Sequence, residues 1–189
     1  MTTVFTEHLT GLGEFSLVRL DPAAHADLVH TWVTRPRNRF WGMLDHTPEQ
    51  VREIYAFVDS LDTHHAYLQL IDEGPIGVFQ TYQPEHDPVG GCYDTRPGDF
   101  GLHLMFDPGD RHLPHLTSVV IPALLRFCFR DPAVRRIVVE PDVRNTRAVT
   151  RMRRHGFEPG PEIDLGHKRA RLAFLTRDRW AATGQEVGR

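Results

Sequence analysis

Residues 100–140 place the strongest constraint on the fold, because they indicate a strand, a long helix and a second strand, in that order. Phe100–Phe106 is a mostly apolar run, and Arg136–Glu140 is a short β-branched run typical of a strand buried in a parallel sheet. Between them, apolar residues recur at the spacing of one helix face: Leu116, Val119, Val120, Ala123, Leu124 and Phe127. A strand–helix–strand unit crosses over right-handed and leaves its strands parallel. The sequence therefore predicts an α/β fold with a parallel pair at this point.

The flanking segments extend this unit into a mixed sheet, antiparallel at its N-terminal side. Residues 15–20 alternate apolar and polar side chains, which predicts a strand. Ala66–Ile71 and Ile76–Tyr82, separated by Asp72-Glu73-Gly74-Pro75, predict an antiparallel hairpin, and a polar loop follows at residues 83–99. The remaining predicted elements are a helix from Asp21-Pro22 to about Val33, a helix behind Thr47-Pro48-Glu49-Gln50, a basic helix over Asn145–His155, and a last strand over Lys168–Thr176 that closes the sheet before a polar tail.

Composition restricts the kind of protein. With 189 residues, 22 Lys+Arg against 25 Asp+Glu and a formal net charge of −3, the chain has the size of a single domain over 1–189 and lacks the basic excess that suits nucleic acid. Cys92 and Cys128 are far apart, which favours a reducing compartment. The N-terminus lacks a signal-peptide pattern, and no apolar run is long enough to cross a membrane. We therefore expect a soluble cytoplasmic protein, while its oligomeric state stays open.

Polar residues stand near the carboxyl ends of the two predicted parallel strands, where ligands bind in open α/β sheets. His103 has apolar neighbours on its strand, and Asp142 lies in Glu140-Pro141-Asp142-Val143-Arg144-Asn145, directly after the second strand. If the strands are adjacent, His103 and Asp142 come from the same rim. The alternatives are a hydrogen-bonded core or surface histidine, and an aspartate that serves as a turn residue or helix cap.

The combination of these motifs is specific. Gly101-Leu102-His103-Leu104 on one strand, followed by Glu140-Pro-Asp-x-Arg-Asn, resembles the GNAT-fold acyltransferases of hydroxamate siderophore biosynthesis. The resemblance spans roughly residues 15–176 and includes Phe40-Trp41, Cys92-Tyr93-Asp94 and Gly156-Phe157. It implies a GNAT fold with splayed parallel central strands, across which an acyl-CoA lies while an acceptor amine approaches from the other side.

The resemblance also implies how the cosubstrate, acetyl-CoA or succinyl-CoA, is held. The backbone of the strand that carries His103 would hold the pantetheine arm at Leu104, Met105 and Phe106. Backbone N–H groups at the start of the next helix would cradle the pyrophosphate. The usual Arg/Gln-x-x-Gly-x-Gly/Ala phosphate loop is replaced by Asp110–Thr117, with no glycine after Gly109. The corresponding candidates are Arg111, His112, His115, Leu116 and Thr117, together with Asn145, which is either close to the CoA arm or simply the helix start.

Direct acyl transfer needs an uncharged nitrogen nucleophile and an acceptor for its proton. Because histidine titrates near neutral pH, His103 is the candidate general base, or orients the acceptor. Asp142 would hydrogen-bond the amine or hydroxylamine, or polarise His103, if the two side chains converge. Backbone N–H groups on the splayed strand would stabilise the tetrahedral oxyanion.

One residue that differs from the lysine-acting members of the family bears on the choice of acceptor substrate. Lysine-acting members of the family carry a Glu in a Tyr-Leu-Glu-Leu-Tyr strand, whereas this chain has Gln80 in Val78-Phe79-Gln80-Thr81-Tyr82. This favours a diamine acceptor without a carboxylate, such as N-hydroxycadaverine, whose distal ammonium would need an acidic contact. Candidates for that contact are Asp45, Asp94 and Asp99. Trp41 and His46 are expected to line the acceptor pocket, or Trp41 is plain core packing.

The 12 histidines do not predict a metal site. His112 and His115 match neither a helical HExxH motif nor a Cys/His zinc pattern, and His64 and His65 would point to opposite faces of a strand. The leading hypothesis is therefore a metal-independent N-acyltransferase that forms a hydroxamate from an N-hydroxylated diamine or hydroxylysine. The alternatives are a general GNAT enzyme acting on another small amine or a protein N-terminus, and a noncatalytic acyl-CoA-binding module.

Overall fold

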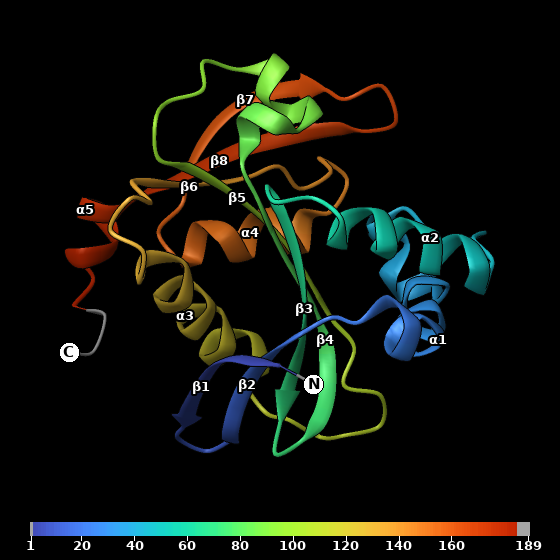
Figure 1. Cartoon of the computed structure of the whole chain (residues 1–189). Coiled ribbons are helices and arrows are strands. Elements are labelled where there is room, and N and C mark those ends of the chain that lie inside the picture. Colours follow the sequence, from blue (N-terminus) through green and yellow to red (C-terminus); the bar gives the residue numbers. More distant parts are fainter. Residues whose placement is uncertain (1, 185–189) are drawn as a thin grey trace. The chain divides into compact units, whose positions relative to one another are not determined.

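The computed structural model, drawn in Figure 1, describes residues 2–184. These residues divide into two compact units. Unit 1 takes in the chain up to Thr81 together with His103–Val120. Unit 2 takes in Tyr82–Leu102 and the described chain from Ile121 onwards.

The strands are β1 (Thr3–Leu9), β2 (Gly13–Arg19), β3 (His64–Ile71), β4 (Gly74–Tyr82), β5 (Asp99–Phe106), β6 (Arg136–Val139), β7 (Glu158–Asp164) and β8 (Arg169–Thr176). The α-helices are α1 (Pro22–Val33), α2 (Pro48–Asp59), α3 (Leu116–Phe129), α4 (Thr146–Arg154) and α5 (Arg177–Ala181). Short 3₁₀ helices are η1 (Pro36–Trp41), η2 (Pro84–His86) and η3 (Pro88–Cys92). Strand β5 and helix α3 each contribute residues to both units.

The strands of unit 1 follow the order β1-β2-β3-β4, and β4 is followed by the last residues of β5. β2 pairs antiparallel with both β1 and β3. The two residues that join β3 to β4, Asp72 and Glu73, have φ angles of 47° and 64°, which is the geometry of a type I′ hairpin turn. The predicted hairpin is therefore confirmed, whereas β1 lies in a segment for which no strand was predicted.

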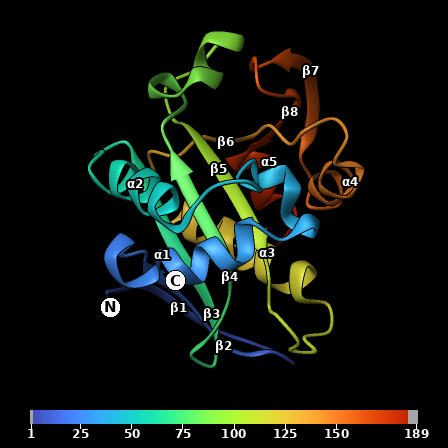
Figure 2. The same cartoon turned by 90° about the vertical axis from the view of Figure 1, so that its right-hand side faces the viewer.

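Helices α1 and α2 cover one face of the unit 1 strands (Figure 2). Both helices begin at the predicted residues, because each has a side-chain cap. The Asp21 carboxylate accepts from the N–H of Ala23 at 2.9 Å, and Thr47 and Gln50 form a reciprocal capping box. The core beneath the helices consists of the buried side chains of Leu20, Val29, Trp32, Val33, Val51, Tyr55, Ala66, Leu68, Val78 and Met105.

In unit 2, the start of β5 pairs parallel with β6, which confirms the predicted parallel pair. β8 pairs antiparallel with β6 on one side and with β7 on the other. The expectation that β8 closes the sheet was wrong, because β7 is the edge strand, and α5 lies in the predicted polar tail. β7 contains Pro159 and Pro161, which argue against a central strand but are tolerated at an edge, and its register shifts between Pro159 and Glu162.

Candidate active site

The parallel pairing of β5 and β6 is short. It joins Asp99–Gly101 to Arg136–Val138, whereas β5 runs on to Phe106 and β6 ends at Val139. Within the described residues, the part of β5 that carries His103 and the predicted pantetheine contacts therefore has no pairing with β6. This early end of the pairing matches the expected separation of the two strands.

Gly101, in the Gly-Leu-His motif, has a physical reason for being glycine. The Tyr82 ring lies against its backbone, so that a Cβ at this position would overlap the ring. The Tyr82 hydroxyl donates to Glu140 Oε2 at 2.8 Å, and Lys168 Nζ lies 3.3 Å from the other carboxylate oxygen. Tyr82 and Glu140 are both buried, and their hydrogen bond holds the ring against the motif's glycine.

His103 and Trp41, two predicted site residues, lie together in unit 1. Their rings meet edge to face, with 6.4 Å between centroids. His103 is partly exposed, and Met105, two residues further along the same face of β5, is buried in the core under α1 and α2. Trp41 packs against this core from the end of η1. The structure thus places an amphipathic aromatic side chain beside the candidate base.

The other predicted acceptor contacts lie on separate elements. His46 precedes α2, and its carbonyl oxygen lies 3.0 Å from His30 Nε2. Gln80 is partly buried in β4, while Asp45 and Asp94 are exposed in loops. Their roles toward a substrate stay predictions.

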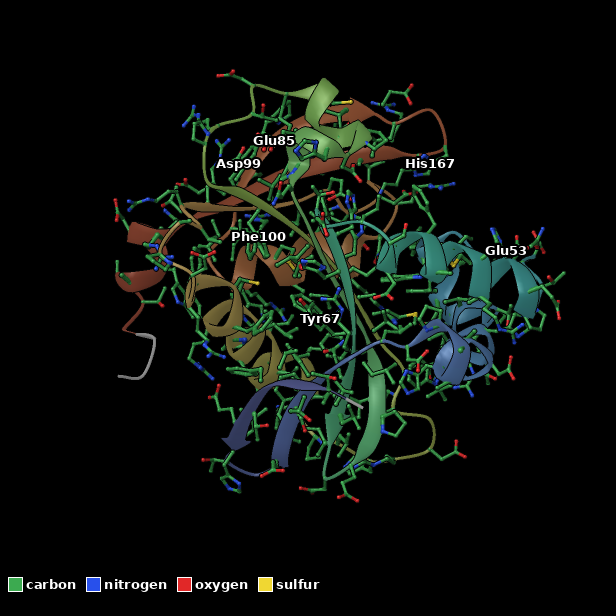
Figure 3. All side chains as sticks on the ribbon, in the orientation of Figure 1. Glu53, Tyr67, Glu85, Asp99, Phe100 and His167 are labelled. Carbon is green, nitrogen blue, oxygen red and sulfur yellow. The ribbon has the colours of Figure 1, made fainter. Side chains whose placement is uncertain are left out.

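Asp99 is occupied by protein donors. Its carboxylate accepts from Arg136 Nε and Nη2 at 2.7 Å each, from the Tyr93 hydroxyl at 2.8 Å and from the Arg96 N–H at 3.0 Å. Figure 3 shows Asp99 at the start of β5, and its side chain is only 3% exposed. Burial pushes the pKa of Asp99 upward, but the hydrogen bonds from Arg136, Arg96 and Tyr93 outweigh it and hold the pKa below the usual range. These contacts tie the starts of β5 and β6 together.

Asp142 forms a tight turn with Arg144 in unit 2. Its buried carboxylate accepts from the Arg144 N–H at 2.8 Å, from Nε at 2.9 Å and from Nη2 at 2.6 Å. The hydrogen bonds from the Arg144 side chain lower the pKa of Asp142, which therefore is ionised at neutral pH. An ionised carboxylate is suited to accept a hydrogen bond from an amine or hydroxylamine. Because His103 belongs to unit 1, the expected convergence of His103 and Asp142 stays a prediction.

Asn145 is the N-cap of α4, as one of its two predicted roles requires. Its side-chain oxygen accepts from the Ala148 N–H at 3.2 Å. A role beside the CoA arm stays a prediction.

The start of α3 offers main-chain donors. The carbonyl of His115 accepts from the N–H groups of Ser118 and Val119, whereas in the described part of the chain the N–H groups of Leu116 and Thr117 have no acceptor. His115 itself has a φ of 56°, a left-handed conformation that usually favours glycine. The glycine-poor loop therefore still reaches a left-handed turn directly before the helix.

Arg111 lies on the same loop, but its side chain contacts the β3–β4 turn. Its Nη1 donates to the carbonyl of Gly74 at 2.9 Å and its Nη2 to the carbonyl of Ile71 at 3.0 Å. These bonds fasten the loop to the β3–β4 turn. His112 is exposed, and the predicted phosphate contacts of both residues stay predictions.

The sequence analysis did not single out Asp107, the residue directly after β5. Its side chain is fully buried and accepts from Arg35, Arg37 and Asn38, which lie about 70 positions earlier in the chain. In the Phe-Asp-Pro-Gly context an aspartate has the pattern of a turn residue, so no local signal points to burial. Only a sequence signal that linked Asp107 to residues about 70 positions earlier could have predicted its burial.

Comparison with known proteins places the chain in a family. A model of the acetyltransferase (GNAT) domain matches residues 21–165, and the chain belongs to this family. Relatives include a candidate O-acetyltransferase, SAT14, from Stachybotrys chartarum, which is 28% identical over 94% of this chain and 40% of its own length. Hydroxyornithine transacylase SID3 from Ajellomyces capsulatus is 26% identical over 94% of this chain and 41% of its own length. N-hydroxyputrescine acetyltransferase from Acinetobacter baumannii is 27% identical over 63% of this chain and 57% of its own length.

The chain spans about half the length of the curated relatives it matches, between 40% and 54% for three of them. The expected resemblance to siderophore-pathway GNAT enzymes is confirmed at the level of the family and of these relatives.

Solved structures confirm the predicted fold. An uncharacterized protein from Bacillus halodurans superposes with a TM-score of 0.87 at 20% identity, covering 94% of this chain and 92% of its own. An aminoglycoside acetyltransferase in complex with coenzyme A superposes with a TM-score of 0.78 at 23% identity, covering 90% of this chain and 99% of its own. The mixed α/β architecture is thus that of the GNAT fold. Within residues 2–184, no helix is long and apolar enough to span a membrane, and no three metal-binding side chains gather at one point.

Proposed function

We propose that the chain is an acyl-CoA-dependent N-acyltransferase that converts an N-hydroxylated diamine, or hydroxylysine, into a hydroxamate for siderophore biosynthesis. The observation that carries acyl transfer is the arrangement on β5. The strand parts from β6 after Gly101, bears His103 beside Trp41, and leads to a helix whose first N–H groups lack acceptors among the described residues.

Acyl-CoA would use backbone groups of β5 and of the start of α3. The N–H groups of Leu116 and Thr117 at the start of the 14-residue helix α3 suit the pyrophosphate, because a helix N-terminus favours anions. The backbone of Leu104–Phe106, beyond the pairing with β6, would hold the pantetheine arm. When bound, the thioester supplies the activated acyl group.

The acceptor nitrogen attacks the thioester carbonyl carbon, an N–C bond forms, and the C–S bond breaks with release of the CoA thiolate. His103 accepts the proton from the nitrogen or orients it, and Trp41 forms an apolar wall beside the reacting amine. The ionised carboxylate of Asp142, in the turn that it forms with Arg144, would accept a hydrogen bond from the substrate amine.

One observation supports an N-hydroxylated acceptor, and a second supports a diamine. The names of two relatives, hydroxyornithine transacylase and N-hydroxyputrescine acetyltransferase, state this substrate chemistry for those proteins. In this chain Gln80 stands where lysine-acting members carry Glu, which favours a diamine. Asp99 is engaged by protein donors, whereas Asp94 and Asp45 are exposed, so Asp94 and Asp45 are the two candidates kept for contact with a distal ammonium.

The test follows thiol release from acetyl-CoA and succinyl-CoA with N-hydroxycadaverine, N-hydroxyputrescine, hydroxylysine, lysine and an aminoglycoside. We expect the highest kcat/KM with an N-hydroxylated amine, and His103→Ala to lower it by about 10²-fold or more. His8→Ala, an exposed histidine on β1, is the matched control and should leave the rate unchanged. Turnover confined to non-hydroxylated amines would favour a general GNAT enzyme, and no turnover with any acceptor would favour an acyl-CoA-binding module.

A further inference from the structure

A buried carboxylate joins the strand of the candidate base to the segment that carries Trp41. Asp107 directly follows β5 and its side chain is fully shielded from solvent. It accepts from Arg35 Nη1 at 2.5 Å, from Arg37 Nε at 3.1 Å and also from Arg37 Nη2, and from Asn38 Nδ2 at 2.7 Å. The Gly109 N–H, 3.3 Å away, completes the set. Charge-assisted bonds of this kind are among the stronger polar contacts in proteins.

The side-chain donors all come from the beginning of one short helix. Arg35 is the N-cap of η1, Arg37 and Asn38 lie in its first turn, and Trp41 is its last residue. Asn38 also donates to the Trp32 carbonyl at 2.9 Å, which links the same point to the end of α1. Asp107 and His103 are four positions apart on and just after β5. The same two segments therefore meet twice, at Asp107 with Arg35–Asn38 and at His103 with Trp41.

Apolar burial contributes little to holding η1, because none of its six residues is buried. Trp41 is partly buried and packs against the core. The polar contacts of Asp107 therefore contribute to the position of η1 beside the packing of Trp41, and loss of the carboxylate would leave two guanidinium groups without their shared partner.

We propose that Asp107 is a positioning residue, which fixes η1 to the end of β5 and so holds Trp41 against His103 in the acceptor site. This inference rests on the proposed function for its kinetic consequence, but not for its structural one. Asp107 touches neither substrate in the scheme above and acts through Trp41.

The structural consequence is measured without any substrate. The chain has three tryptophans, of which Trp32 and Trp180 are 4% and 3% exposed, so quenching by acrylamide reports mainly on the partly exposed Trp41. We expect Asp107→Asn to increase the quenching constant and to speed amide hydrogen exchange in residues 36–41. Arg37→Gln, at a half-exposed side chain, should change both in the same direction with less risk to folding. Trp41→Phe shows how much of the signal belongs to Trp41.

The kinetic arm uses the same variants. Asp107→Asn should raise KM for the acceptor amine about tenfold, with KM for acyl-CoA within about twofold of wild type, because a misplaced pocket wall weakens acceptor binding. Asp59→Asn, which breaks an exposed ion pair with Arg19 in the same unit, is the matched control and should change neither value. Unchanged quenching and exchange in folded Asp107→Asn and Arg37→Gln would overturn the inference. Absence of turnover in the wild type would instead overturn the proposed function and leave the quenching result standing.

Discussion

At the scale of single residues, buried carboxylates that accept hydrogen bonds from several protein donors stabilise the folded chain. Asp99 is such a group, and its contacts assign it to the joint between β5 and β6. Asp99→Asn removes the negative charge but keeps the shape of the side chain. It leaves Arg136, whose side chain is 12% exposed, without its carboxylate partner. Losing one member of a buried pair costs about 3–5 kcal/mol. We therefore expect Asp99→Asn to lower the free energy of unfolding at pH 7 by about 3 kcal/mol, measured by urea denaturation.

The same variant has a predictable pH dependence. Because the folded-state pKa of Asp99 lies below its unfolded value, its stabilisation is present above about pH 4 and is lost as pH falls through the folded pKa. The stability gap between wild type and Asp99→Asn should therefore narrow in acid. Asp94→Asn, at an exposed neighbour, should stay within about 0.5 kcal/mol of wild type. A gap that is as wide at pH 3 as at pH 7 would contradict this assignment.

At the scale of elements, the Gly-Leu-His strand depends on close approach of Tyr82. Gly101→Ala would place a methyl group into the Tyr82 ring, which Glu140 holds, and we expect a loss of about 2–3 kcal/mol. Tyr82→Ala removes the obstacle at its own cost of about 3–5 kcal/mol, so the double variant should be less destabilised than the sum of the two by at least about 1 kcal/mol. Gly91→Ala, whose Cβ would meet nothing within 4 Å, is the control. Additive effects in thermal or urea unfolding would exclude the steric explanation.

At the scale of the whole molecule, the two compact units share elements. Unit 1 is not a continuous segment, and both β5 and α3 pass from one unit to the other within an unbroken strand or helix. We therefore expect a single cooperative transition, as for one domain, with far-ultraviolet circular dichroism and tryptophan fluorescence giving the same midpoint. Two separated midpoints would indicate that the units unfold independently.

Binding of coenzyme A should also raise the stability of the whole folded chain. A ligand that binds only the folded chain stabilises it by about 2.7 kcal/mol at a concentration of 100 Kd, which corresponds to a rise in Tm of roughly 5–10 °C for a chain of this size. Pantetheine, which lacks the pyrophosphate that α3 would receive, should produce a much smaller shift at the same concentration. Equal shifts with the two ligands would argue against a phosphate site at Leu116 and Thr117.

Much of the fold was predictable from local patterns. The caps at Asp21 and Thr47, the β3–β4 hairpin and the parallel β5–β6 pair follow from spacing and from residues that act within a few positions of one another. β7 was not predictable in this way, because its prolines disfavour a strand until a neighbour, β8, makes it an edge. For the candidate site, the sequence singled out His103, Trp41 and Asp142, but not what surrounds them.

The sequence by itself thus determined most of the central elements, their order and the residue types available for acyl transfer. Only the tertiary structure decided which carboxylates are engaged by distant residues: Asp99 by Arg136, and Asp107 by Arg35 and Arg37. Backbone preferences act over one turn or one strand, whereas burial and ion pairing join residues up to 72 positions apart, and these contacts exist only once the chain has folded.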